Sequence, residues 1–218
     1  MATLVIITIL PLGVITCQLA FGAAGPVGYS IYKVAFLVLP LLYCRWHGIS
    51  VFRDILQFGN WRSGLKLSIG LSIAAAAIFA GAYAAWSDFL IDEATIVDNI
   101  DQQFGVDRTT VLLVAPFTIL LNSLLEESFY RGFSFGLLVR KNLAVGYLLP
   151  AVAFTVQHVL FIYHWVSVLP LVLAIVGLFV LALLLEAMYG RFDTIVAPWI
   201  VHAGGDVAMM GIALTMFY

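Results

Sequence analysis

The chain has 218 residues, of which 63% are hydrophobic and only 10% are charged, and its formal net charge is −2. Ordinary soluble domains carry about 25% charged residues, so this composition excludes a globular protein with a water-facing surface. The charge balance also argues against a nucleic-acid partner. We expect a single transmembrane domain over residues 1–218, with membrane lipids as its surroundings and no separate soluble domain.

Apolar runs separated by polar residues predict an all-α membrane protein, a bundle of seven to eight transmembrane helices. No Lys or Arg precedes the first run, so we interpret it as a retained span and not a cleaved signal peptide. Residues 51–58 mix apolar and charged side chains, which is typical of a short interfacial helix. The predicted spans lie near residues 3–23, 27–45, 65–86, 109–138, 143–163, 166–187 and 194–217.

Cationic side chains concentrate in one set of connections. These connections follow the second, fourth and sixth predicted spans, and segment 87–108 between spans three and four is acidic, with Arg108 as its one cation. The positive-inside rule therefore predicts a cytoplasmic N-terminus, an extracytoplasmic C-terminus and a solvated acidic connection outside. The cations on the predicted cytoplasmic side are Arg45, Arg53, Arg62, Lys66, Arg140, Lys141 and Arg191.

The fourth predicted span contains the sequence Glu126-Glu127-Ser128-Phe129-Tyr130-Arg131. An ionisable side chain at the bilayer centre costs about 2.5–3.5 kcal/mol on insertion scales, so such groups are usually paired or functional. Positions four apart share a helical face, which predicts a Glu127–Arg131 pair. Glu126 has no cation three or four residues later, so its partner must come from another helix or from water. Glu126 is our candidate general base.

Two later spans contribute polar groups in apolar surroundings. Phe154 and His158 lie in the fifth span, and His202 and Asp206 lie four apart in the seventh, with small residues between them. A lone histidine in a span is often only a hydrogen-bond partner for a neighbouring helix. At about 1.5 Å per residue, however, Glu126 and these two histidines and Asp206 fall about 12–22 Å from the cytoplasmic ends. We therefore expect one shared site near mid-membrane.

Together these motifs resemble a known family. The order Glu-Glu-x-x-x-Arg, Phe-x-x-x-His and His-x-x-x-Asn/Asp is similar to that of the CPBP intramembrane proteases, the CAAX-prenyl-endopeptidase and bacteriocin-processing (ABI) family. The matching stretch, Glu126 to Asp206, is about a third of the chain. The resemblance implies a helical bundle with a cavity open to the cytoplasm and a motif-bearing core over about 109–217.

The resemblance also implies roles for individual residues. Glu126 and His158 would activate a water molecule for attack on a peptide carbonyl, and His202 and Asp206 would support the resulting oxyanion. Glu127, Arg131 and Phe154 occupy supporting positions of the motifs. The implied activity is that of a CAAX-prenyl-protease-like membrane endopeptidase.

Asp206 departs from the pattern, because many relatives carry Asn at this position. A neutral amide can donate a hydrogen bond to an oxyanion, whereas an ionised carboxylate repels it. Asp206 must then be protonated, orient His202 or help to bind a metal. The set Glu126, His158, His202 and Asp206 could also ligate Zn²⁺, although we favour a mechanism that requires no metal because Glu126 is needed as the base.

Three functions remain open at the level of sequence. The favoured one is an endopeptidase acting near a membrane-associated C-terminal or leader segment of a peptide or protein. The alternatives are a non-catalytic binding or immunity protein of the same family and a proton-coupled transporter, which would favour inverted repeats that the sequence lacks. The short chain and the absence of organellar targeting signals suggest a prokaryotic cytoplasmic membrane. The oligomeric state is not indicated by the sequence.

Overall fold

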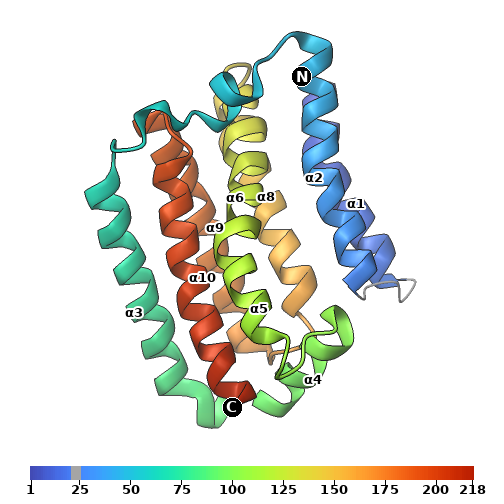
Figure 1. Cartoon of the computed structure of the whole chain (residues 1–218), viewed down its shortest axis with the longest axis vertical. Helices are drawn as coiled ribbons and strands as arrows, with labels where there is room; N and C mark the ends of the chain where they lie inside the picture. Colours follow the sequence, from blue (N-terminus) through green and yellow to red (C-terminus); the bar gives the residue numbers. More distant parts are fainter. Residues whose placement is uncertain (21–25) are drawn as a thin grey trace.

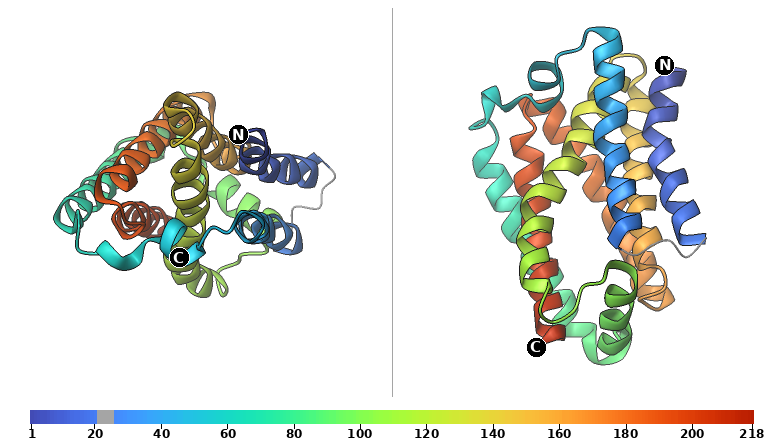
Figure 2. Two further views of the ribbon diagram at one scale, coloured as in Figure 1. Left: turned by 90° about the horizontal axis from the view of Figure 1, so that it is seen from above. Right: turned by 45° about the vertical axis from the view of Figure 1, so that its right-hand side comes forward.

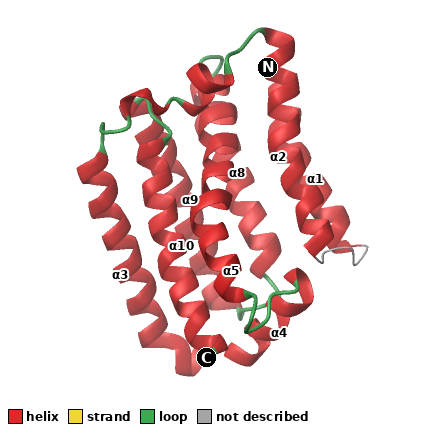
Figure 3. Ribbon diagram, in the orientation of Figure 1, coloured by secondary structure: helices red, strands yellow, loops and turns green. Residues whose placement is uncertain are grey.

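The computed structural model describes residues 1–20 and 26–218, and the described chain is a bundle of helices (Figure 1). No strand occurs among these residues, which confirms the predicted all-α class (Figure 3). The end of the first predicted span, at residues 21–23, lies outside the described part. The main helices are α1 (Ala2–Ala20), α2 (Pro26–His47), α3 (Leu65–Leu90), α4 (Glu93–Phe104), α8 (Leu143–Ile162), α9 (Val168–Phe192) and α10 (Val196–Phe217).

The fourth predicted span is one continuous helical stretch, Val111–Leu138, with an irregular interior. Two π-helical segments flank the short α-helical turn that carries the two glutamates. Because π-helical turns are rare and occur frequently at functional sites, this irregularity indicates that the stretch contains a functional site. Its segments are α5 (Val111–Pro116), η3 (Phe117–Asn122), α6 (Ser123–Glu127), η4 (Ser128–Phe135) and α7 (Gly136–Leu138).

Five helical stretches in the described residues are long and apolar enough to cross a membrane: Leu65–Leu90, Val111–Leu138, Leu143–Ile162, Val168–Phe192 and Val196–Phe217. Their outward faces expose large apolar side chains, as in Leu113 at 75%, Ile78 at 71% and Val168 at 78%. Such surfaces are favourable in lipid and not in water. The chain is an integral membrane protein, while the predicted count of seven to eight spans stays a prediction.

The helices lie side by side, with α1 and α2 on one side of the bundle and α3 on the other (Figure 2). The N-terminus and the C-terminus lie at opposite ends (Figure 1). Helix α3 packs closely along α10, and Gly204 makes this possible because glycine has no side chain. A Cβ at this position would lie 2.4 Å from the Cβ of Ser72. The small residues between His202 and Asp206 thus admit a neighbouring helix.

The connection between α2 and α3 and the acidic connection after α3 also contain helices. Residues 51–58, predicted to be a short helix, form η1 (Val51–Leu56), which is followed by η2 (Phe58–Asn60). η1 packs on η4 where Gly132 allows a close approach to the Ile55 carbonyl. The acidic connection contains α4, which the sequence reading did not predict. Asp92 caps α4 by accepting a hydrogen bond from the Thr95 amide, and the bond from the Thr95 hydroxyl lowers the pKa of Asp92.

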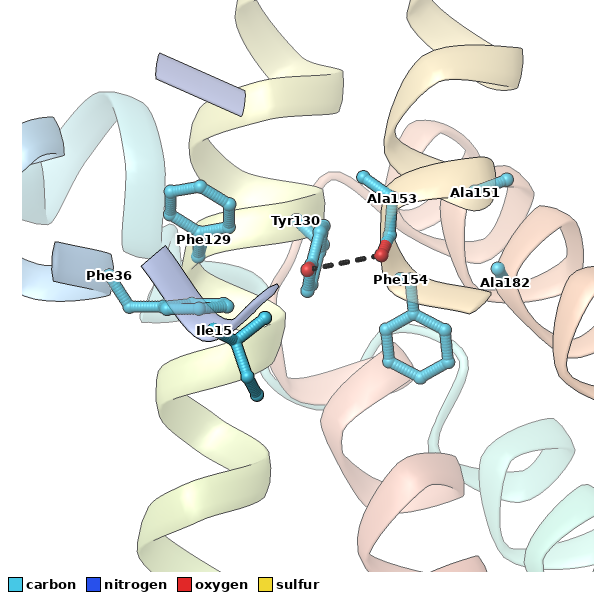
Figure 4. Packing of buried hydrophobic residues seen from close by; sticks show 8 residues of the cluster. All are labelled: Ile15, Phe36, Phe129, Tyr130, Ala151, Ala153, Phe154 and Ala182. Carbon is cyan, nitrogen blue, oxygen red and sulfur yellow. Dashed lines mark hydrogen bonds between the residues drawn. The ribbon is translucent and has the colours of Figure 1, made fainter. Parts of the chain in front are cut away.

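An aromatic cluster in the middle of the bundle holds the span Val111–Leu138 against its neighbours. Phe129 and Tyr130 face Phe36 of α2, with ring centroids 4.3 Å and 5.5 Å from it. Tyr130 also meets Phe154 of α8 edge to face, at 5.4 Å. Figure 4 shows these rings converging from three helices. Because Tyr130 is one turn beyond Glu126 and Phe154 is one turn before His158, this cluster fixes the polar groups next to it.

Candidate active site

Glu126 is buried, with 2% of its surface exposed, and its two carboxylate oxygens have different surroundings. Oε1 accepts hydrogen bonds from Asn122 Nδ2 at 3.1 Å and Gln157 Nε2 at 2.9 Å. It also accepts from the ammonium of Lys33, which reaches it from α2. The expectation that Glu126 finds its partner on another helix is therefore met by Lys33 and Gln157. This oxygen is saturated and anchors the carboxylate.

The second oxygen of Glu126, Oε2, has no hydrogen-bond partner among the described residues. It lies 3.5 Å from His158 Nε2 and 3.9 Å from His202 Nε2. The ligand atoms of Glu126, His158 and His202 all lie within 4.8 Å of one another. Three side chains from three different helices, predicted from sequence to share a site, are thus brought together around one unsatisfied oxygen.

The Nδ1 atom of each imidazole determines whether the Nε2 atom facing Glu126 carries a hydrogen. His158 Nδ1 lies 2.8 Å from the Phe154 carbonyl oxygen, and His202 Nδ1 lies 2.7 Å from Glu127 Oε1. Both partners can only accept, so both Nδ1 atoms carry the hydrogen. In a neutral imidazole, Nε2 then presents its lone pair to the site. The hydrogen bonds of the two Nδ1 atoms therefore fix the ring orientations, as in sites that hold a water molecule or a metal ion.

Glu127 links this site to a buried cation. Its Oε1 accepts from Arg131 Nη1 at 2.9 Å, and neither side chain is exposed. The predicted pair between positions four apart is therefore present, and the same oxygen also accepts the hydrogen bond from His202. Arg131 lies over the Phe154 ring, with its Cζ 4.4 Å from the centroid. Glu127 thus orients His202, a contact that the sequence reading did not assign to it.

Asp206 is nearly buried, and its Oδ1 lies 3.9 Å from His202 Nε2, which is too long for a hydrogen bond. Its Oδ2 has no hydrogen-bond partner among the described residues. Of the three roles considered for Asp206, the orienting contact to His202 is made instead by Glu127. Asp206 faces the site as an additional carboxyl group, and it is not part of the three-residue cluster that could hold a metal.

Residues 108–208 match the family model described as "Type II CAAX prenyl endopeptidase Rce1-like". The chain carries an Rce1-like domain of the CAAX protease family. No curated protein matches the chain. No solved structure matches it either. The Rce1-like domain contains every residue of the three motifs, and the family resemblance inferred from those motifs is confirmed.

The Rce1-like domain receives one component of its site from outside its own limits. Lys33 lies in α2, well before residue 108, and the sequence motifs do not include it. Asn122 and Gln157 lie inside the domain and were also missed. A polar amide in an otherwise apolar helix was the available signal for both. Tyr130 donates to Gln157 Oε1 at 2.6 Å, so it fixes the amide that donates to Glu126.

An apolar groove of about 330 Å³ lies between α2, η1 and the span that carries the glutamates, and the clustered residues Glu126, His158 and His202 do not line it. His158, with 26% of its side chain exposed, is the most open of the three clustered residues. That the site opens towards the cytoplasm stays a prediction. The groove is lined by Phe36, Leu37, Pro40, Leu41, Cys44, Val51, Ile55, Leu56, Phe58, Leu121, Leu124, Leu125, Ser128 and Phe129.

The cluster of Glu126, His158 and His202 also fits a zinc ion. A carboxylate and two imidazoles are a common catalytic zinc set, with a fourth position left for water or substrate. Both imidazoles are held by a hydrogen bond from Nδ1, as metal-binding histidines commonly are. Glu126 Oε2, buried and without a hydrogen-bond partner in the described chain, is the corresponding carboxylate ligand atom.

Proposed function

We propose that this protein is an intramembrane endopeptidase that hydrolyses a peptide bond near a membrane-associated segment of its substrate. The observation that carries the proposal is the unsatisfied Oε2 of Glu126, placed 3.5 Å and 3.9 Å from the Nε2 atoms of two imidazoles. The Rce1-like domain supports the reaction class. A water molecule held by these groups would be both activated and aimed.

In the proposed reaction, Glu126 Oε2 takes one proton from a water molecule, and the water oxygen bonds to the peptide carbonyl carbon. His158 Nε2 accepts a hydrogen bond from the remaining water proton and so orients the attack. The carbonyl oxygen becomes an oxyanion in a tetrahedral intermediate. The carbon–nitrogen bond then breaks, and Glu126 returns its proton to the leaving amine. The products are a new carboxyl terminus and a new amino terminus.

His202 and Asp206 support the oxyanion in this proposal. The carboxylates of Glu126 and Glu127 lie on either side of the His202 ring and balance the charge of its imidazolium form. His202 in that form donates from Nε2 to the oxyanion while Nδ1 remains bonded to Glu127. Asp206 contributes as the neutral acid, because only the protonated carboxyl group can donate to the oxyanion.

A zinc-dependent reaction is the alternative within the same function. Glu126, His158 and His202 would hold the ion, which would act as a Lewis acid and lower the pKa of a bound water. We favour the metal-free route because the carboxylate is then available as the base. Metal analysis of the purified protein, together with turnover before and after treatment with 1,10-phenanthroline, separates the two. Metal-free turnover that survives the chelator supports the preferred route.

The proposed substrate is a peptide or protein with a membrane-associated tail. In a prokaryotic cytoplasmic membrane, where we place the protein with its N-terminus inside, a secreted peptide, a leader or a C-terminal sorting tail fits better than a farnesylated CAAX protein. The apolar groove along the glutamate-bearing span suits such a tail.

Comparative proteomics of protein termini tests the proposed function. Cells that express wild type are compared with cells that express Glu126→Ala, and cells that express Asp98→Asn serve as the control. Asp98 is an exposed acid in α4, far from the motifs in sequence. We expect at least one membrane-associated protein to keep an unprocessed terminus only in the Glu126→Ala cells. Identical termini in all three strains would contradict the proposal.

A further inference from the structure

The two adjacent glutamates pair with two different buried cations, and the second of these cations comes from another helix. Glu127 pairs with Arg131 on its own helix, and Glu126 pairs with Lys33 on α2. Lys33 is 9% exposed and Glu126 is 2% exposed. Each carboxylate of the Glu-Glu pair therefore has its own cation, although only one of these cations belongs to the sequence motif.

A buried ammonium is costly unless it is paired and hydrogen-bonded, so its placement is informative. Lys33 bonds to Oε1, the oxygen that Asn122 and Gln157 also hold, and not to Oε2, which faces the two histidines. Three donors on one oxygen leave the carboxylate little freedom to rotate. The Lys33 ammonium thus balances the charge of Glu126 without occupying the side on which a water molecule would bind.

The position of Lys33 is fixed by the aromatic cluster. Its Nζ lies 5.1 Å from the centroid of the Phe36 ring, one turn further along α2. The Phe36 ring in turn packs against Phe129, three residues after Glu126. The same contact that joins α2 to the glutamate-bearing span therefore sets the reach of the lysine to the carboxylate.

We propose that Lys33 is a positioning residue for the hydrolytic reaction, so that α2, outside the Rce1-like segment, completes the active site. Lys33 holds the Glu126 carboxylate in the rotamer that turns Oε2 towards His158 and His202. This inference rests on the proposed function. It goes beyond that function because it assigns a role to a residue and a helix that the motifs do not include.

The pairing itself is tested by a double-mutant cycle on the full-length protein in detergent micelles. Free energies of unfolding are measured by titration with SDS for wild type, Lys33→Met, Glu126→Gln and the double variant. We expect Lys33→Met to lower the unfolding midpoint and to shift the equilibrium constant by about tenfold or more, because it leaves Glu126 buried and unpaired. In the Glu126→Gln background, the same change should shift it by less than about threefold.

The role in positioning is tested by turnover in vesicles. The probe is an internally quenched peptide that spans the terminus left unprocessed in Glu126→Ala cells. We expect kcat of folded Lys33→Met to fall by about 10–100-fold, as for other groups that orient a reacting side chain, while KM changes little. Lys33→Arg, which retains the charge, should recover most of kcat. A lysine that only fills space between α2 and its neighbours would give no such dependence on charge.

The possible results separate the two proposals. Additive stability effects in the cycle, or an unchanged kcat in folded Lys33→Met, would overturn the role of Lys33. If Lys33→Met does not fold, the double variant, which removes both charges, must fold, and its failure would also overturn the pairing. Equal turnover by wild type and Glu126→Gln would instead overturn the proposed function, whereas the stability cycle would still report on the pair.

Discussion

Replacing Glu127 by glutamine separates the two tasks of this residue. The carboxylate binds Arg131 at 2.9 Å and His202 at 2.7 Å through one oxygen, in a place where neither Glu127 nor Arg131 is exposed. Glu127→Gln leaves a buried guanidinium without the carboxylate to which it is hydrogen-bonded. Removing one partner of a buried ion pair costs about 3–5 kcal/mol, and we expect a loss of stability of that size in an SDS titration.

The same substitution should slow turnover by about 10–100-fold, because His202 loses the carboxylate that orients its ring. The double variant Glu127→Gln/Arg131→Met removes the uncompensated charge, so it should regain most of the stability but not the turnover. Asp98→Asn makes the same acid-to-amide change at an exposed position and serves as the matched control. A stability loss below about 1 kcal/mol together with unchanged turnover would refute the role that we assign to Glu127.

Three further substitutions test separate parts of the account. Asp206→Asn should keep turnover within about threefold of wild type while Asp206→Ala loses it, if this residue acts as a neutral donor; the reverse order would show that the carboxylate is needed. Tyr130→Phe removes the hydroxyl that donates to Gln157 and should cost about 1–3 kcal/mol of stability and reduce turnover, measured in the same two assays. Gly204→Ala should cost about 1–3 kcal/mol, because the new Cβ would lie 2.4 Å from an α3 side chain. Gly205→Ala, whose Cβ would meet nothing closer than 4.0 Å, should be nearly neutral, and equal effects at the two glycines would contradict the close packing of α3 on α10.

The parts of the fold that could be predicted from the sequence are those set by local periodicity. Apolar runs gave the all-helical class and the places of the helices, and a spacing of four gave the Glu127–Arg131 pair. The lack of a nearby cation singled out Glu126. These features depend on helix geometry and on the cost of a charge in lipid, and both can be evaluated from a short stretch of sequence.

Contacts between distant segments could not be predicted in the same way. Lys33 meets Glu126 across 93 positions of the chain, and no local rule selects that partner over water. Orienting His202 was one of the three roles predicted for Asp206, whereas a carboxylate from another helix, Glu127, makes that bond. The π-helical segments around α6 change the direction of side chains along the span, and hydrophobic periodicity does not indicate them.

The central claim is that Glu126 activates water for peptide hydrolysis inside the bundle. The most direct measurement is the cleavage rate of the quenched peptide by purified wild type and Glu126→Gln in vesicles, with Asp98→Asn as the control. Loss of a general base typically lowers the rate by about 10²–10⁴-fold, and we predict a loss in this range for Glu126→Gln alone. Cleavage by Glu126→Gln at the wild-type rate would contradict the claim.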